Sequence, residues 1–174
     1  MKTQLKKFSA EGTVLMGSLF AGMDGKAPPL PALKRAHAHR DAVVAAIEQL
    51  SGAIVQAGED SVLAFWGPEA GHAQRALDAA RAILELPTAR QLPMRLVLGT
   101  GELAGDFTGP RKRFQITGEA VTLAVRLHER SWAPGPALRL SQSTVDLLTA
   151  PPALQPEEPL ESLKVYALRP SSPA

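Results

Sequence analysis

The chain has 174 residues, of which 45% are hydrophobic and 21% are charged, enough apolar material for one well-covered core but little for two. Nineteen basic and seventeen acidic residues leave a formal charge of +2, which argues against the dense positive field of a protein that binds nucleic acid. The absence of cysteine excludes a disulfide framework, a thiolate metal site and thiol redox chemistry, and it is typical of a cytoplasmic protein.

The first fifty residues predict a buried strand followed by a helix. An apolar run over 13–20 has the length of a core strand, and the Gly- and Pro-rich stretch 25–31 ends it. Apolar residues then recur at helical spacing over 32–50, so we expect an amphipathic helix. Its histidines His37 and His39 face different ways on a helix, which favours solvated helix-end side chains over a metal or phosphate site.

The middle of the chain predicts a hairpin, a helix and a strand. Residues 53–55 and 62–66 are apolar and flank a polar turn near 58–60, a pattern typical of a β-hairpin. Residues 69–86 have helical spacing with an acidic residue at the start, so a second amphipathic helix is expected. Residues 94–98 predict a strand.

A Gly-rich stretch over 99–105 opens the second half, and we expect it to form a tight turn after the preceding strand. Its glycine spacing matches neither the Walker nor the dinucleotide-binding fingerprint. A strand over 114–117 and a third helix over 119–130 should follow.

The remaining residues predict short closing elements. A strand is expected over 138–140, followed by a short helix over 141–148 that Ser141 caps. Residues 151–159 are rich in proline and predict a link, and residues 163–168 predict a final strand.

These elements predict an α+β fold. Their order, β-α-β-β-α-β, resembles the ferredoxin-like core, in which both helices cover one face of an antiparallel sheet. No run approaches the ~20 apolar residues of a membrane span, so none is expected.

Two stretches, 58–67 and 99–127, resemble the catalytic domain of class III nucleotide cyclases, the adenylate and guanylate cyclases. The resemblance implies a cyclase homology domain over 11–169, with residues 1–10 as an N-terminal extension and 170–174 as a disordered tail. It also implies a cytoplasmic protein of intracellular signalling that forms a homodimer or heterodimer through the cyclase-type face.

The family binds its two divalent cations with two Asp residues, and this chain has only one at a matching position. In the stretch LMGSL, Ser18 stands where the first-strand Asp belongs, and a hydroxyl is a weak ligand for Mg²⁺. In AGEDSVLAFWG, Asp60 matches the second Asp, although the additional Glu59 alters the turn. The alternative is that Asp60 is an ordinary polar turn residue.

The family selects its base with a Lys in the hairpin and an Asp or Thr in a later strand. The corresponding residues here are Gln56 and Gln115. Amide groups hydrogen-bond a purine edge either way round, so they do not select adenine over guanine. The alternative interpretation makes both glutamines surface strand residues.

An Asn and an Arg one helical turn apart orient the ribose and stabilise the transferred phosphate in the family. In GEAVTLAVRL these positions hold Thr122 and Arg126, which the i, i+4 spacing places on one helix face. Arg126 retains the guanidinium that binds phosphate, whereas Thr122 offers one short hydroxyl. Alternatively, Arg126 pairs with a carboxylate across a dimer seam.

These replacements predict a degenerate cyclase domain, a pseudoenzyme that acts as a regulatory or dimerisation module. The alternative is a weak or divergent adenylate or guanylate cyclase that uses Asp60 and Arg126. Mg²⁺ or Mn²⁺ and ATP or GTP are expected ligands only if nucleotide binding is retained, and no other cofactor or nucleic-acid partner is expected.

Overall fold

The computed structural model describes residues 5–19, 30–58, 60–90, 94–130 and 137–168. The described helices and strands, in chain order, are β1 (Phe8–Ser18), α1 (Leu30–Gln49), β2 (Ala53–Ala57), β3 (Ser61–Trp66), α2 (His72–Glu85), the 3₁₀ turn η1 (Pro87–Arg90), β4 (Arg95–Thr108), β5 (Arg113–Thr117), α3 (Glu119–Glu129), β6 (Leu138–Ser141), α4 (Gln142–Asp146), β7 (Gln155–Leu160) and β8 (Leu163–Leu168).

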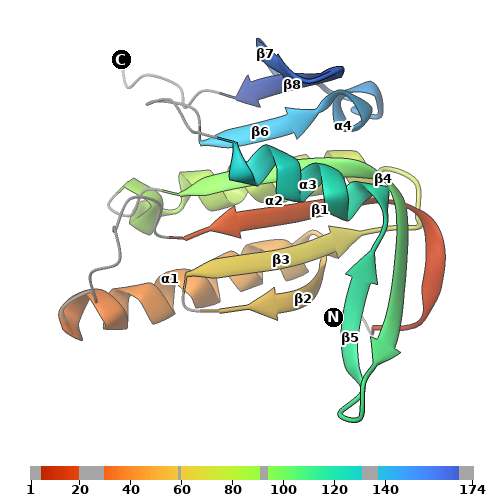
Figure 1. Ribbon diagram of the computed structural model, residues 1–174. Coiled ribbons are helices and arrows are strands. Elements are labelled where there is room, and N and C mark those ends of the chain that lie inside the picture. Colours follow the sequence, from red (N-terminus) through yellow and green to blue (C-terminus); the bar gives the residue numbers. More distant parts are fainter. Residues whose placement is uncertain (1–4, 20–29, 59, 91–93, 131–136, 169–174) are drawn as a thin grey trace.

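The described strands form one twisted sheet in the order β2-β3-β1-β4-β6-β8-β7, and β5 pairs with the far half of β4 (Figure 1). The first four strands pair antiparallel and, with α1 and α2 between them, form the predicted ferredoxin-like βαββαβ core. The α+β class is confirmed. The complete sheet is mixed, because β6 joins β4 in parallel after the crossover through α3.

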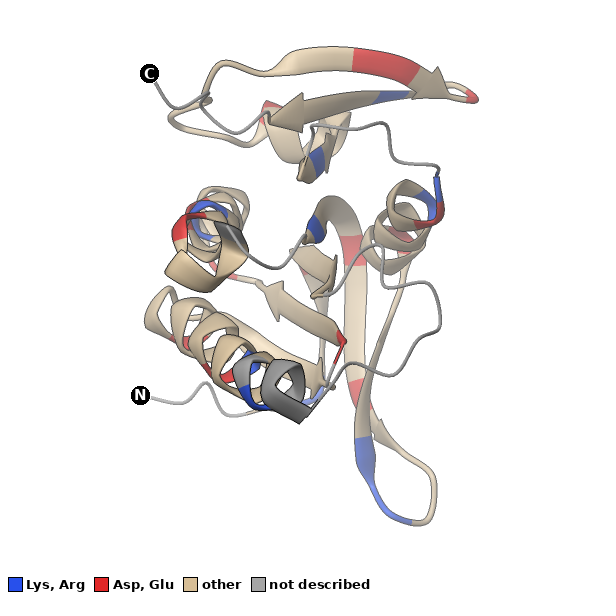
Figure 2. Ribbon diagram, turned by 90° about the vertical axis from the view of Figure 1, so that its left-hand side faces the viewer, with Lys and Arg blue, Asp and Glu red and all other residues tan. Residues whose placement is uncertain are grey.

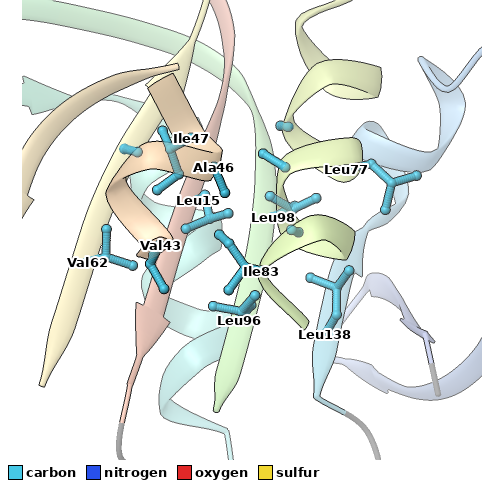
Figure 3. Close-up of a cluster of buried hydrophobic side chains, with 14 of the residues drawn as sticks. Leu15, Val43, Ala46, Ile47, Val62, Leu77, Ile83, Leu96, Leu98 and Leu138 are labelled. Atoms are coloured by element: carbon cyan, nitrogen blue, oxygen red, sulfur yellow. The ribbon is translucent and has the colours of Figure 1, made fainter. Parts of the chain in front are cut away.

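Helices α1 and α2 cover one face of the sheet and bury the larger apolar cluster. Alternate residues of the strands point toward them, because successive side chains of a strand face opposite sides. Figure 3 shows Leu15 and Leu98 from the central strands packed against Ile47 of α1 and Ile83 of α2, and all four are fully buried. The predicted placement of these two helices on one face is therefore correct.

Helix α3 lies on the opposite face, over β4 and β1 (Figure 1). Its buried residues Ala120, Ala124 and Leu127 join a second cluster that includes Val14 and Val97 from the two central strands. Since this face of α3 is buried against the sheet, the opposite, polar face of the helix points away from the sheet above its central strands.

The structure corrects the expected turn over 99–105. β4 continues unbroken from Arg95 to Thr108, and the glycines are places of close approach. A Cβ on Gly99 would lie 2.7 Å from the carbonyl oxygen of Ala120 in α3, and one on Gly105 would lie 2.4 Å from the Phe8 ring. The far half of β4 and β5 form a long ribbon, and its tip is basic (Figure 2).

Several other boundaries differ from the prediction, most of all at β1 and β7. β1 begins at Phe8, five residues before the start expected from the apolar run, and its first residues pair with β4. The expected proline-rich link contains β7, which is an edge strand and therefore tolerates Pro156 and Pro159. The cap of α4 is as predicted, because the Ser141 side chain accepts a hydrogen bond from the Thr144 backbone nitrogen. The expected tail over 170–174 lies outside the described residues.

None of the helices in the described residues combines the length and the apolar character needed to cross a membrane.

Candidate functional site

The ends of β1 and β3 bring the two candidate metal positions together. Ser18 is the last residue of β1 and pairs with Ser61, which directly follows Asp60. The Leu19 backbone nitrogen donates a 2.7 Å hydrogen bond to the carbonyl oxygen of Asp60, which fastens the hairpin turn to the end of β1. The Asp60 side chain is exposed, and Glu59 lies outside the described residues. The two positions therefore share one end of the sheet.

Helix α3 supplies a partner for Ser18 that the sequence did not predict. A 2.8 Å hydrogen bond joins Ser18 Oγ and His128 Nε2, although the residues are 110 positions apart. Burial, and to a lesser extent the positive charge of Arg95, lower the pKa of His128 from its ordinary value of 6.5. Neither protonation form of an imidazole is negatively charged, so this hydrogen bond brings no negative charge to the candidate metal position.

Thr122 and Arg126 both lie on the exposed face of α3, as their spacing predicts. The Thr122 hydroxyl donates a 3.2 Å hydrogen bond to the carbonyl oxygen of Gly118, one turn earlier in the chain. Arg126 Nη1 lies 3.5 Å from Glu161 Oε2, in the turn between β7 and β8. Arg126 therefore has a carboxylate partner within its own chain, and the hydroxyl of Thr122 is used by the helix backbone.

The two candidate base-selecting residues are exposed strand residues. Gln56 of β2 pairs with Leu63, whose side chain packs on the α3 face of the sheet. Gln115 alternates with Phe114 and Ile116, which both pack on that face, so its side chain points the other way. Within the described part of the chain, no hydrogen bond joins the two glutamines. The strands β2 and β5 that carry the two glutamines contact each other, but the amide groups are not bonded to one another.

His39 is not a solvated helix-end residue. It is a fully buried residue of α1. Its Nδ1 lies 2.5 Å from Oγ1 of Thr88 in η1, and its Nε2 lies 2.9 Å from Met94 Sδ. Burial lowers the pKa of His39 from its ordinary value of 6.5. The expectation of a solvated side chain was wrong because the helical pattern does not show which polar residues the helix buries, and the buried histidine is a packing residue.

A buried chain of hydroxyl groups joins α2 to α4 through the sheet. The Thr13 hydroxyl lies 2.9 Å from His72 Nδ1 and 2.7 Å from Thr100 Oγ1, which lies 2.9 Å from Thr144 Oγ1. The other His72 nitrogen, Nε2, lies 3.6 Å from a Glu11 carboxylate oxygen. A Thr-His-Glu series suggests nucleophilic catalysis, but Thr13 is fully buried and no substrate reaches it. The network satisfies polar groups inside the fold.

The described residues contain no cluster of three or more His, Asp or Glu side chains arranged to hold a metal ion.

Solved structures of nucleotide cyclase domains resemble nearly the whole chain in fold. A double mutant of the guanylyl cyclase domain of the RhoGC fusion protein from the aquatic fungus Blastocladiella emersonii, a monomeric crystal structure, has a TM-score of 0.78 at 17% identity. The match covers 95% of this chain and 98% of that chain. The adenylyl cyclase CyaB from P. aeruginosa gives a TM-score of 0.77 at 19% identity, over 96% of this chain and 97% of that one.

This chain has the fold of a class III nucleotide cyclase catalytic domain. The guanylyl cyclase Cya2 agrees, with a TM-score of 0.70 at 18% identity over 94% of this chain and 93% of that one. No family model matches the sequence, and no curated protein matches it. At such low identity the likeness establishes the cyclase fold, so activity has to be argued from the side chains of the site.

Proposed function

We propose that this chain is a catalytically degenerate cyclase homology domain that acts as a regulatory, dimerising module in intracellular signalling. The observation that carries the proposal is the hydrogen bond between Ser18 and His128 at the position of a metal-binding Asp. Phosphoryl transfer depends on charged groups that are in place before the reaction, and each lost contact typically slows it by orders of magnitude.

The donor set does not fit a two-cation site. Two divalent cations need several carboxylate oxygens, whereas these positions offer the single carboxylate of Asp60 and a neutral hydroxyl. The Ser18 hydroxyl already has His128 as a partner, and the pKa of that histidine is lowered by burial. These positions therefore lack the charge to hold two divalent cations.

The α3 side of the site supports the same proposal. Thr122 has a shorter polar group than the amide the family uses, and its hydroxyl already donates to Gly118. Arg126, unlike Thr122, is the residue type that the family has at this position of the helix, and its exposed guanidinium can bind a phosphate. Retained nucleotide binding without turnover is consistent with this arrangement.

The dimerisation part of the proposal rests on the sheet face beside α3. Met16, Val55 and Leu63 are half-buried apolar residues on this face. Figure 1 shows α3 over β4 and β1, while β3 and β2 carry no helix on the same side. One guanylyl cyclase domain of similar fold, at 16% identity and a TM-score of 0.77, was solved as a non-canonical dimer. We propose that a second cyclase-type domain covers this apolar face.

A combined binding and turnover experiment tests the proposal. The purified chain is titrated by calorimetry with ATP and with GTP, each with Mg²⁺ or Mn²⁺, and the same mixtures are assayed for cyclic nucleotide. We expect no cyclic nucleotide and, by sedimentation, a concentration-dependent dimer. Turnover that disappears in Asp60→Ala and Arg126→Ala, but not in the surface control Asp146→Ala, would overturn the proposal.

The second candidate is a weak or divergent cyclase. Its support is that Asp60 is exposed beside the end of β1 and that Arg126 remains half-exposed. Ser18→Asp separates the two candidates, because it restores the second carboxylate. A divergent cyclase gains turnover with Mn²⁺ in this variant, whereas a domain that lacks the remaining chemistry stays inactive.

A further inference from the structure

The β7–β8 hairpin is joined to the α3 region by ion pairs at three successive points along its length. These are Arg139–Glu157 at 2.7 Å, Arg130–Glu158 at 3.6 Å and Arg126–Glu161 at 3.5 Å. The acidic stretch of β7 is visible in Figure 2. Arg126 lies on α3 and Arg130 directly follows it, whereas Arg139 lies on strand β6 and donates hydrogen bonds to carbonyl oxygens at the end of α3. The hairpin is therefore aligned along the C-terminal half of that helix.

The Arg139–Glu157 pair anchors the hairpin. The Arg139 side chain is 2% exposed and that of Glu157 is 18% exposed. Arg139 Nη1 also donates to the carbonyl oxygens of Leu127 and Arg130, at 3.4 Å and 3.2 Å, where the last turn of α3 needs donors. Because a buried arginine with this many partners has little freedom, β7 is held in a fixed position relative to α3.

The anchored hairpin presents Glu161 at its tip. Leu160 pairs with Leu163, so Glu161 is the first residue of the two-residue turn, and its φ is 57°. Glycine or asparagine adopts this left-handed conformation more easily than a glutamate. The side chain at this position nevertheless carries a carboxylate, which lies opposite the guanidinium of Arg126.

We propose that Glu161 is an internal competitor of phosphate for Arg126 and sets how strongly this chain binds polyphosphate groups. Carboxylate and phosphate oxygens accept hydrogen bonds from the same guanidinium nitrogens, so both cannot occupy them fully. The inference rests on the proposed function in one respect, that Arg126 is the side chain that retains phosphate affinity.

The expected size of the competition follows from the exposure of the pair. The Arg126 side chain is 47% exposed and that of Glu161 is 73% exposed, so solvent screens their attraction. Exposed ion pairs of this kind change an equilibrium by about two- to fivefold. Glu161 therefore attenuates binding and does not abolish it, and a phosphate ligand displaces it reversibly.

Binding of inorganic tripolyphosphate and of ATP, measured by calorimetry without metal at low ionic strength, tests the inference. We expect Glu161→Gln to bind both about two- to fivefold more tightly than the wild-type chain. Glu161→Lys should bind more tightly still. Glu158→Gln is the matched control, because it removes the same charge from the same hairpin but faces Arg130. Circular dichroism checks that each variant is folded.

The double variant Glu161→Gln with Arg126→Gln should lose the gain in affinity for tripolyphosphate and ATP that Glu161→Gln shows alone. Equal affinities of the wild-type chain, Glu161→Gln and Glu158→Gln would overturn the inference, and so would the absence of binding in all variants, Glu161→Lys included. Neither result affects the proposed dimerising role, which sedimentation tests separately. Cyclic nucleotide formation by the wild-type chain would overturn the proposed function and leave the affinity comparison intact.

Discussion

Gly99 should be the least replaceable glycine of β4, because α3 packs directly on it. A Cβ at this position would lie 2.7 Å from the Ala120 carbonyl oxygen and 2.9 Å from the Ala124 backbone nitrogen. Both are backbone atoms of α3, so the helix itself has to move away from the sheet. Overpacking of this kind costs about 1–3 kcal/mol, and the lower chain entropy of the unfolded Gly→Ala variant offsets about 0.4–1 kcal/mol of it.

Gly99→Ala is therefore expected to lose up to about 2.6 kcal/mol of unfolding free energy, a fall in Tm of up to roughly 10 °C for a chain of this length. Gly101→Ala is the matched control on the same strand and face, because the three atoms nearest to its Cβ would all belong to the Glu119 side chain, the closest at 2.7 Å. That side chain is exposed and can rotate away, so this variant should keep or slightly raise its Tm. Thermal and urea unfolding followed by circular dichroism measure both, and an equal Tm for the two variants would refute the packing argument.

Three further predictions concern buried polar groups. Arg139→Leu leaves the Glu157 carboxylate without its partner in a largely buried place and should cost about 3 kcal/mol, measured by urea unfolding; a loss below about 1 kcal/mol would contradict the anchoring role. Thr13→Val removes the hydroxyl partner of His72 inside the core and should cost about 1–3 kcal/mol, with Tm as the measure. The folded-state pKa of His39 is lowered, so the unfolded chain binds its proton first as the pH falls. Stability should therefore be complete above the ordinary pKa of 6.5 and decline as the pH falls below it toward the folded-state pKa, and His39→Gln should flatten this decline in a series of Tm measurements.

The parts of the fold that the sequence predicts well are those where burial alone sets the pattern. The final strand over 163–168 alternates cleanly and was predicted with its exact bounds. The far half of β4 was missed because the glycines were interpreted as a turn signal. In this strand the missing side chains of the glycines leave room for neighbouring groups, since α3 packs at Gly99 and the Phe8 and Phe114 rings lie against Gly105. A sequence alone does not distinguish a glycine that turns the chain from one that admits a neighbour.

The candidate site, like the fold, could be predicted from the sequence only in part. The positions of Ser18 and Asp60 at one sheet end, and of Arg126 on an exposed helix face, follow from local order and spacing. The hydrogen-bond and ion-pair partners of these residues do not follow from local order or spacing. His128 meets Ser18 across 110 positions, and Glu161 meets Arg126 across 35, through a hairpin whose first strand was itself interpreted as a link. Such contacts depend on how separate elements pack, which no local pattern records.

These partners change what the replacements in this chain imply. Taken alone, the serine at position 18 indicates only a weak ligand for a metal ion. The hydrogen bond between the Ser18 hydroxyl and His128 also gives this position a contact inside the fold. Ser18→Asp should therefore cost stability if the Ser18–His128 contact supports the packing of α3, and Ser18→Ala should cost about 1 kcal/mol for the lost hydrogen bond. A Ser18→Ala variant as stable as the wild-type chain would instead mean that the Ser18 hydroxyl contributes nothing to the stability of the fold.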